Sequence, residues 1–356
     1  MSIEYHRPPV RVAVVGLGRS FFSSHYPVFK AHPALFKIVA ACDIMKERRD
    51  IIAEDFPNCK MFRQLSDMLD ERDIDLVDIA TCSTDHVKHA LMALERGHWT
   101  LLESPMALNI DDAQLLRGAA TKAKNRLLVL QRGLFAPDFL LAKSMMNDSR
   151  LGEIYQVCIR REDFIRRDDW QTVKRLGGGA SYYAMTDLIL QALKILPQPP
   201  IQMWSELKRI ASLGDAEDYA HVNLKTRTQI SADIEFNGGV LPPCRAPSFM
   251  IRGERGVFSV NENSPIGTLT IVDPDYKFSR RRSSVRTPSL TDMHEDIPVI
   301  TSEVSLSKGT LYGPSAFWKC VYDSVRTAAP FPLQLEDSIE AIKFTHLMKK
   351  TSPFGS

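Results

Sequence analysis

Several signals that would place a chain in a specialised class are absent from this 356-residue sequence. Its six cysteines include no C-x-x-C pair, which argues against a zinc knuckle or a dithiol redox site. No run of about 18 apolar residues occurs, so no transmembrane helix is expected. The 45 basic side chains balance 43 acidic ones, which predicts no nucleic-acid or anionic-membrane partner. The first residues lack a signal-peptide apolar core, so we expect a cytoplasmic protein with reduced thiols.

The first 130 residues alternate apolar, strand-like runs with segments of helical periodicity. Strands are predicted at Val12–Val15, Ile38–Ala41, Leu76–Ala80, Thr100–Leu102 and Leu127–Leu130, and helices at 21–32, 46–55, 64–70, 86–96 and 110–123. Continuous apolar strands separated by helices are typical of a parallel sheet covered on both faces. The first half is therefore predicted to be a parallel α/β domain.

After about residue 150 the pattern changes to successive strands with few helices. Strands are predicted at Glu153–Arg161, Gln202–Ala211, Tyr219–Thr226, Gln229–Phe236, Phe249–Arg252, Val257–Asn261 and Thr268–Val272, and helices after Gly177–Gly179, around 314–327 and around 335–349. This pattern predicts a large, mostly antiparallel sheet with one open face. Because the chain exceeds one ordinary domain, we place two, at 1–128 and 129–356. The basic run Lys277–Arg286 is interpreted as a solvated loop.

A glycine turn follows the first predicted strand. Gly16 would permit the tight turn, and Gly18 would let the backbone approach a pyrophosphate at the start of the next helix. The third position of the G-x-G-x-x-G pattern is Phe21, which predicts weaker helix–strand packing there. The context of a first strand and helix nevertheless indicates a dinucleotide site.

An acidic residue, Asp43, ends the second predicted strand. A carboxylate there can accept hydrogen bonds from the adenosine ribose, which favours NAD. Lys46, Arg48 and Arg49 follow closely, so NADP stays open as an alternative. The simpler interpretation is that Asp43 only caps the following helix.

Four further motifs carry a family resemblance over nearly the whole chain: "AVVGLGRS", "IATCSTDHVKHALMALERGHWTLLESPMAL", "LGEI" and "LGGGASYYAMTDLILQALKIL". With them the chain resembles the glucose–fructose oxidoreductase/inositol dehydrogenase (Gfo/Idh/MocA) family. The resemblance implies a Rossmann domain followed by an α/β domain built on a large open sheet. It also implies that this sheet forms the interface of a homodimer or homotetramer.

The resemblance implies a set of cofactor-binding residues: Gly16, Gly18, Arg19, Ser20, Phe21, Asp43, Thr81, Cys82, Ser83, His86 and Glu103. For His86 a packing role is the competing interpretation. His86 and His89 share a helix face, but no third ligand is suggested, so we expect no metal site. The family's substrate-contacting segment corresponds to Arg161, Trp170 and Lys174.

Departures from the family pattern lie where the chemistry is expected. Ser104 replaces the lysine of the E-K-P motif, and after the three glycines Tyr183, Met185, Asp187 and Leu190 replace the family's Asp, Gly, His and second Asp. The family's lysine resembles a proton relay beside the carbon that exchanges hydride. Serine is too weakly acidic for that role without an activating base.

Proton transfer is therefore assigned to Asp187 and Tyr183, with Ser104 as a hydrogen-bonding partner of the substrate. The two are four residues apart, so an α-helix would place them on one face. A carboxylate in an apolar helix is unfavourable unless it is paired or functional. The alternative is a structural role, with Asp187 paired to Lys194 or to a nearby arginine.

The function expected from the sequence is an NAD(P)-dependent oxidoreductase that moves hydride between nicotinamide and a sugar, cyclitol or related polyol. Two alternatives stay open. The chain could be a catalytically inactive dinucleotide sensor, because all the motif positions have changed. It could also resemble the biliverdin reductases, which lack the lysine and need no dedicated base.

Overall fold

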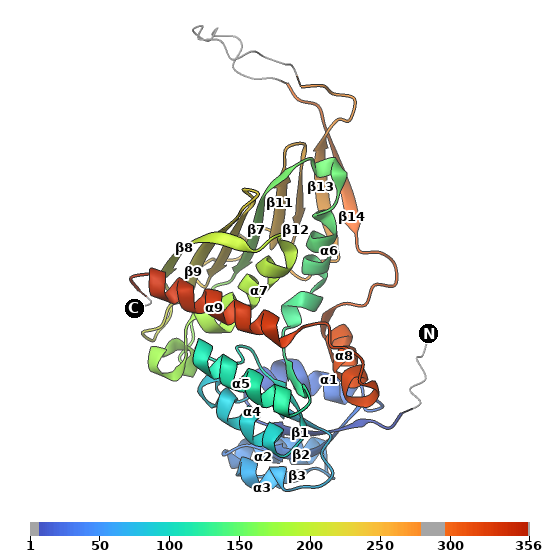
Figure 1. Ribbon diagram of the computed structural model, residues 1–356, viewed down its shortest axis with the longest axis vertical. Coiled ribbons are helices and arrows are strands. Elements are labelled where there is room, and N and C mark those ends of the chain that lie inside the picture. Colours follow the sequence, from blue (N-terminus) through green and yellow to red (C-terminus); the bar gives the residue numbers. More distant parts are fainter. Residues whose placement is uncertain (1–6, 279–295, 355–356) are drawn as a thin grey trace.

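The computed structural model describes residues 7–278 and 296–354 of the chain. The first of its two domains is built on a six-stranded parallel sheet (Figure 1). The strand order is β3-β2-β1-β4-β5-β6. The strands are β1 (Val10–Val15), β2 (Phe36–Cys42), β3 (Lys60–Phe62), β4 (Leu76–Ile79), β5 (Trp99–Leu102) and β6 (Leu127–Val129). The helices are α1 (Tyr26–Ala31), α2 (Lys46–Asp55), α3 (Leu65–Leu69), α4 (His86–Glu95) and α5 (Ile110–Lys122). The predicted parallel Rossmann sheet is confirmed.

The second domain is built on an eight-stranded sheet in the order β14-β13-β12-β11-β7-β10-β9-β8. Its strands are β7 (Ile154–Glu162), β8 (Pro200–Lys208), β9 (Tyr219–Thr226), β10 (Ser231–Asn237), β11 (Phe249–Gly253), β12 (Gly256–Val260), β13 (Ile266–Val272) and β14 (Val299–Ser305). Only β7 and β10 pair in parallel, so the prediction of a mostly antiparallel sheet is confirmed. Helices α6 (Pro137–Met145), α7 (Thr186–Ile195) and α9 (Leu335–Thr351) cover one face (Figure 1).

Some predicted boundaries differ from the structure. The strand predicted to reach Ala211 ends at Lys208, because the backbone N–H groups of Ile210 and Ala211 donate to the Asp218 carboxylate. Gln229 has φ of 68° and belongs to a turn, so β10 begins two residues later. Strands β3 and β14 and helix α6 were not predicted. Most of the basic run, from residue 279 on, lies outside the described residues.

A helix from the second half of the chain completes the first domain. Helix α8 (Gly313–Thr327) packs against α1 and β1. Its Trp318 is buried, with its ring 4.9 Å from that of Phe29 and 5.4 Å from that of Phe36. The core of the Rossmann domain is therefore shared by residues on both sides of the predicted boundary at 128/129.

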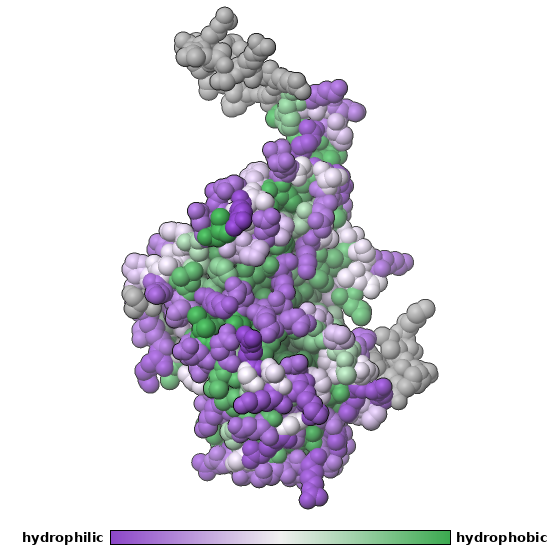
Figure 2. Space-filling model, in the orientation of Figure 1, coloured by the Kyte–Doolittle hydropathy of each residue, from purple (hydrophilic) through white to green (hydrophobic). Residues whose placement is uncertain are grey.

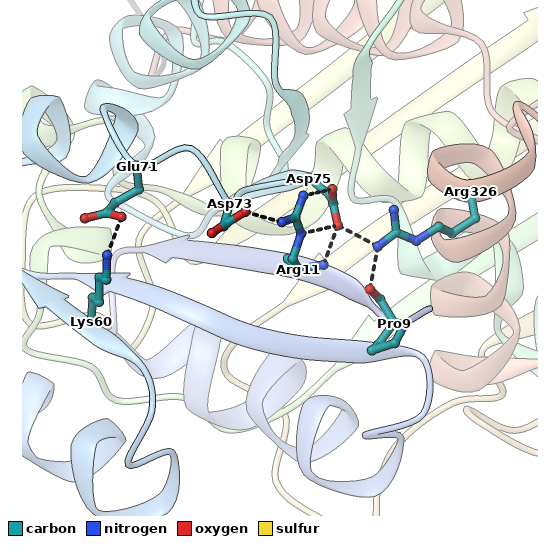
Figure 3. Close-up of polar contacts among 7 residues, drawn as sticks. All are labelled: Pro9, Arg11, Lys60, Glu71, Asp73, Asp75 and Arg326. Carbon is teal, nitrogen blue, oxygen red and sulfur yellow. Dashed lines mark hydrogen bonds and ion pairs between the residues drawn. The ribbon is translucent and has the colours of Figure 1, made fainter. Parts of the chain in front are cut away.

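Ion pairs fasten α8 to the amino end of the parallel sheet (Figure 3). Asp75 lies between Arg11, 2.9 Å away, and Arg326 of α8, 2.5 Å away, and Arg326 also donates to the Pro9 carbonyl. Burial acts to raise the pKa of Asp75, but hydrogen bonds from the two arginines lower it to about 2.

The two domains differ in surface character on the face shown in Figure 2. Hydrophilic residues predominate on the first domain, in the lower part of the view, and hydrophobic residues gather towards the middle of the view and on the second domain above it. Among the described residues, no helix is both long and apolar enough to span a membrane.

Candidate active site

The carboxyl ends of the parallel strands bring four predicted cofactor residues to one edge of the sheet. Gly16 follows β1, Asp43 follows β2, Thr81 follows β4 and Glu103 follows β5. Gly16 has φ of 90°, and a Cβ atom there would lie 2.6 Å from the backbone of Ala80. Only glycine therefore fits the turn, which runs directly against the loop after β4.

The glycine turn fits a bound dinucleotide. A Cβ atom on Gly18 would meet nothing closer than Arg48 Nη1 at 3.9 Å, so the backbone is open to a pyrophosphate. Phe21 does not weaken the packing as predicted, because its ring is fully buried, 6.4 Å from that of Phe29. Any contact of Phe21 with a cofactor is made through its backbone.

Asp43 holds the glycine turn in place. Its Oδ2 accepts the Leu17 N–H at 2.8 Å, and its Oδ1 accepts the Met45 N–H at 2.8 Å. Arg48 Nη1 lies 3.4 Å from Oδ2. The carboxylate therefore does more than the helix-capping alternative requires, and the Arg48 cation stands beside it.

Glu103 is the centre of a buried polar cluster. Its Oε1 accepts hydrogen bonds from the Ser20 hydroxyl and from His25 Nε2, the latter at 3.0 Å. Its Oε2 accepts the Ser104 N–H at 3.1 Å. His25 Nδ1 lies 2.7 Å from Asp78 Oδ2. Burial alone would raise the pKa of Glu103, but the hydrogen bond from His25 and the charge of that residue lower it to about 2.

The turn that carries Ser104 is braced from two sides. His86 is buried, and its Nδ1 donates to the Pro105 carbonyl at 2.8 Å. Gln131 Nε2 lies 3.4 Å from the Ser104 hydroxyl oxygen. No imidazole among the described residues contacts that hydroxyl, so Ser104 has no base to activate it.

Asp187 lies beside the turn after β6. Its Oδ2 lies 3.4 Å from Gln191 Nε2, and its Oδ1 is buried without a hydrogen-bond partner among the described residues. Burial raises the pKa of Asp187 to about 6, although the charges of Arg161 and Arg132 act to lower it. The alternative partner Lys194 instead pairs with Asp337 at 2.6 Å.

Gly133 makes room for this carboxyl group. A Cβ atom at Gly133 would lie 2.2 Å from Asp187 Oδ2 and 2.0 Å from Gln191 Nε2. Asp187 can therefore occupy its position only because residue 133 has no side chain.

Among the described residues, no hydrogen bond joins Tyr183 to Asp187, and the α-helix expected to carry both does not include Tyr183. Tyr183 lies in a π-helical turn, Ser181–Met185, whereas Asp187 lies in the first turn of α7. The Tyr183 ring packs edge-on against Phe236, and the Arg167 guanidinium lies 5.0 Å from its centre. Burial raises the pKa of Tyr183.

The other predicted residues lie in several places. Arg19 pairs with Asp169 at 2.7 Å, Arg161 with Asp138 at 3.0 Å, and Lys174 Nζ donates to the Phe354 carbonyl at 2.8 Å. Lys174 therefore lies against the C-terminal segment. Thr81 and Cys82 are half-buried beside the glycine turn, Ser83 is buried, and Trp170 begins a short 3-10 turn, Trp170–Thr172.

Three residues of this site were not predicted: His25, Gln131 and Gln191. One signal pointed to His25, because Asp78 is a charged residue inside an otherwise apolar predicted strand and needs a partner when buried. No local pattern identified the two glutamines.

Comparison with known proteins agrees with this geometry. Residues 10–131 match the profile described as oxidoreductase family, NAD-binding Rossmann fold, and residues 139–259 match that of the GFO/IDH/MocA C-terminal domain. The chain belongs to the Gfo/Idh/MocA family. Its first domain is thus an NAD(P)-binding Rossmann domain, as the open cradle at Gly18 also indicates.

Relatives within the Gfo/Idh/MocA family include proteins of known and unknown activity. An uncharacterized oxidoreductase of Schizosaccharomyces pombe is 35% identical over 54% of this chain and 53% of its own, so the match spans about half of that protein. A scyllo-inositol 2-dehydrogenase (NADP(+)) of Bacillus subtilis is 21% identical over 96% of this chain and 94% of its own. The solved WlbA dehydrogenase of Chromobacterium violaceum, in complex with NADH and UDP-GlcNAcA, is 19% identical with a TM-score of 0.75, covering 99% of this chain and 96% of that one, and shows the shared fold.

Proposed function

We propose that this protein is an NAD(P)-dependent oxidoreductase that moves hydride between nicotinamide and a hydroxyl-bearing carbon of a sugar, cyclitol or related polyol. The observation that carries the proposal is the Asp187 carboxyl group, with its buried, unpartnered Oδ1. A general acid or base works best when its pKa lies near the working pH, and burial raises that of Asp187 to about 6.

The chain's own residues divide the remaining tasks. When bound, the dinucleotide supplies the hydride acceptor for alcohol oxidation. Ionised Asp187 takes the hydroxyl proton through Oδ1, while Gln191 holds Oδ2. Ser104 offers a hydrogen bond to a second substrate hydroxyl, with Gln131 orienting its side chain. Tyr183 has no proton-transfer role in this arrangement, because it packs on Phe236 and burial raises its pKa.

Polyols suit the site because its unpartnered atoms accept hydrogen bonds. Asp187 Oδ1, Gln131 Oε1 and Gln191 Oε1 are all buried without a partner among the described residues. Buried acceptors need donors, and several adjacent hydroxyl groups would supply them. Relatives that act on scyllo-inositol and on D-glucosides support the same substrate class.

For the cofactor, we propose NAD as the preferred form and NADP as a tolerated one. Asp43 is already bound to two backbone N–H groups, yet it still places a negative charge at the adenosine end. Arg48 offsets this charge from 3.4 Å. Titrating the protein with NADH and NADPH tests the preference. Arg48→Ala is expected to weaken NADPH binding more than NADH binding, and an equal effect on both would contradict the role given to Arg48.

Activity is tested by incubating the protein with NAD+ or NADP+ and a panel of sugars, cyclitols and polyols, and following reduced cofactor. Turnover with a polyol that is lost in Asp187→Asn supports the proposal. Tight dinucleotide binding without turnover of any partner would contradict it and favour the inactive sensor.

We also propose that the face of the large sheet opposite α7 and α9 joins copies of this chain into a homodimer or homotetramer. That face carries half-exposed charges, with Asp233 lying 2.8 Å from Arg160 and 3.0 Å from His221, and the exposed Trp204 stands beside them. Aromatic residues and arginine are enriched at interfaces. Trp204→Glu is expected to shift the mass measured by light scattering towards the monomer, and a monomeric wild-type protein would overturn this proposal.

A further inference from the structure

A buried histidine links the glycine turn to the turn that carries Ser104. His25 is fully buried at the end of the π-helical turn Phe21–His25. Its Nδ1 lies 2.7 Å from Asp78 Oδ2 and its Nε2 lies 3.0 Å from Glu103 Oε1. An ionised carboxylate can only accept hydrogen bonds, so when both carboxylates are ionised both ring nitrogens carry protons and His25 is a cation. Burial raises the pKa of Asp78, and the charge and hydrogen bond of His25 act to lower it, so an imidazolium at His25 is what keeps Asp78 ionised.

The surroundings favour this cation. Burial acts to lower the pKa of His25, but the charges and hydrogen bonds of Asp78 and Glu103 raise it to about 9. The ring also packs against Trp318 of α8, edge-on at 5.5 Å, and against Phe21 at 6.2 Å, and it is fully buried. The cluster is therefore a carboxylate–imidazolium–carboxylate row closed off from solvent.

One end of this row reaches two segments of the cofactor site. Glu103 Oε1 also accepts the Ser20 hydroxyl, from the start of the helix after the glycine turn, and Oε2 accepts the Ser104 N–H. Other charges near Glu103 are those of Arg132, which lowers its pKa, and of Asp187 across the site. Moving the Glu103 carboxylate would release both segments together.

We propose that His25 is a positioning residue, an imidazolium clamp that fixes the Glu103 carboxylate and thereby the spacing between Ser20 and Ser104 in the dinucleotide site. Asp78 is the anchor that holds the imidazolium from behind. The expected effect of His25 on dinucleotide affinity rests on the proposed function, because it requires that the protein binds NAD(P). The protonation of His25 is a property of the chain alone.

Two substitutions separate the clamp from general support of the core. A glutamine amide can reach where Nε2 lies, so His25→Gln keeps a donor towards Glu103. An asparagine amide reaches only as far as Nδ1, so His25→Asn keeps a donor towards Asp78 and loses the one towards Glu103. We expect His25→Asn to weaken NAD(P)H binding by about tenfold or more, and His25→Gln to stay within about threefold of wild type. Equal weakening in the two variants would overturn the clamp.

Nitrogen-15 NMR of the histidine rings in the wild-type protein provides a second readout that needs neither variant nor ligand. His25 is expected to show two protonated ring nitrogens near pH 7, where an unperturbed histidine is mostly neutral. A single protonated nitrogen at that pH would overturn the proposal. If the wild-type protein bound no dinucleotide, the proposed function would fail, while the NMR result would still decide the state of His25.

Discussion

The turn after β5 and helix α7 each bring a carboxyl group to the candidate active site, and the pKa values of these two groups shift in opposite directions. Burial acts to raise the pKa of both. Glu103 receives three hydrogen bonds, from Ser20, His25 and the Ser104 N–H, and its pKa falls to about 2. Asp187 receives one long contact, and its pKa rises to about 6. The number of hydrogen-bond donors around each group therefore explains why Glu103 stays ionised and why Asp187 can take up and release a proton near neutral pH.

The largest expected effect comes from removing the Asp187 carboxylate, which we propose carries the proton. Asp187→Asn should lower turnover by about 100-fold or more, because a positioned general base contributes about 10²–10⁴ in rate. Dinucleotide affinity should hardly change, since Asp187 lies outside the Glu103 cluster. Steady-state kinetics and cofactor titration measure both quantities. The matched control is Asp73→Asn, an exposed carboxylate at the other end of the sheet, and similar rates in the two variants would refute the assignment.

Removing the anchor should instead affect stability. Glu103→Gln leaves the His25 charge with one partner fewer in a buried site, which should lower the free energy of unfolding by about 3 kcal/mol. Urea denaturation measures this loss. The control is Glu71→Gln, which breaks the exposed pair of Glu71 with Lys60 (Figure 3) and should cost less than about 1 kcal/mol. Equal losses would mean that the buried cluster contributes no more than a surface pair.

A smaller change can displace the proton carrier without altering its chemistry. Gly133→Ala would place a methyl group against Asp187 and Gln191, so we expect lower turnover and a loss of about 1–3 kcal/mol in stability from overpacking. Gly118→Ala is the control, because a Cβ atom there, in helix α5, meets nothing within 4 Å. That variant should be about 0.5–1 kcal/mol more stable than wild type. Unchanged turnover in Gly133→Ala would show that Asp187 need not sit where it does.

The last expected effect is in the pH dependence of stability. Asp187 has a folded-state pKa raised from 3.8 to about 6, so its contribution is present below 3.8 and is lost as pH rises through 6. His25, raised from 6.5 to about 9, loses its contribution as pH rises through 9. Unfolding measured across this range should show Asp187→Asn flattening the lower window and His25→Gln flattening the upper one. An unchanged slope in Asp187→Asn over the lower window, or in His25→Gln over the upper one, would contradict the corresponding assignment.

The parallel sheet could be predicted from sequence because strands covered on both faces leave continuous apolar runs. Val12, Ala13 and Val14 in β1, for example, are all fully buried. Strand β3 escaped prediction because it has only three residues, too few for a pattern. The change from lysine to Ser104 and the unusual Asp187 were also visible in the motifs.

The cluster around His25 could not be predicted, because its partners lie 53 and 78 residues further along the chain. Only the sheet order brings β4 and β5 next to the helix that carries it. The π-helical turn Ser181–Met185 could not be predicted either, because the spacing of Tyr183 and Asp187 was taken from a regular α-helix.

Helix α8 has a consequence for how this protein can be divided. A fragment ending at residue 131, where the first family profile ends, would contain every strand of the parallel sheet but no Trp318. Phe29 and Phe36 would then face water at the place that the indole fills. The stretch that matches the first family profile therefore lacks part of its own core, and the first domain is complete only when α8, near the end of the chain, has been synthesised.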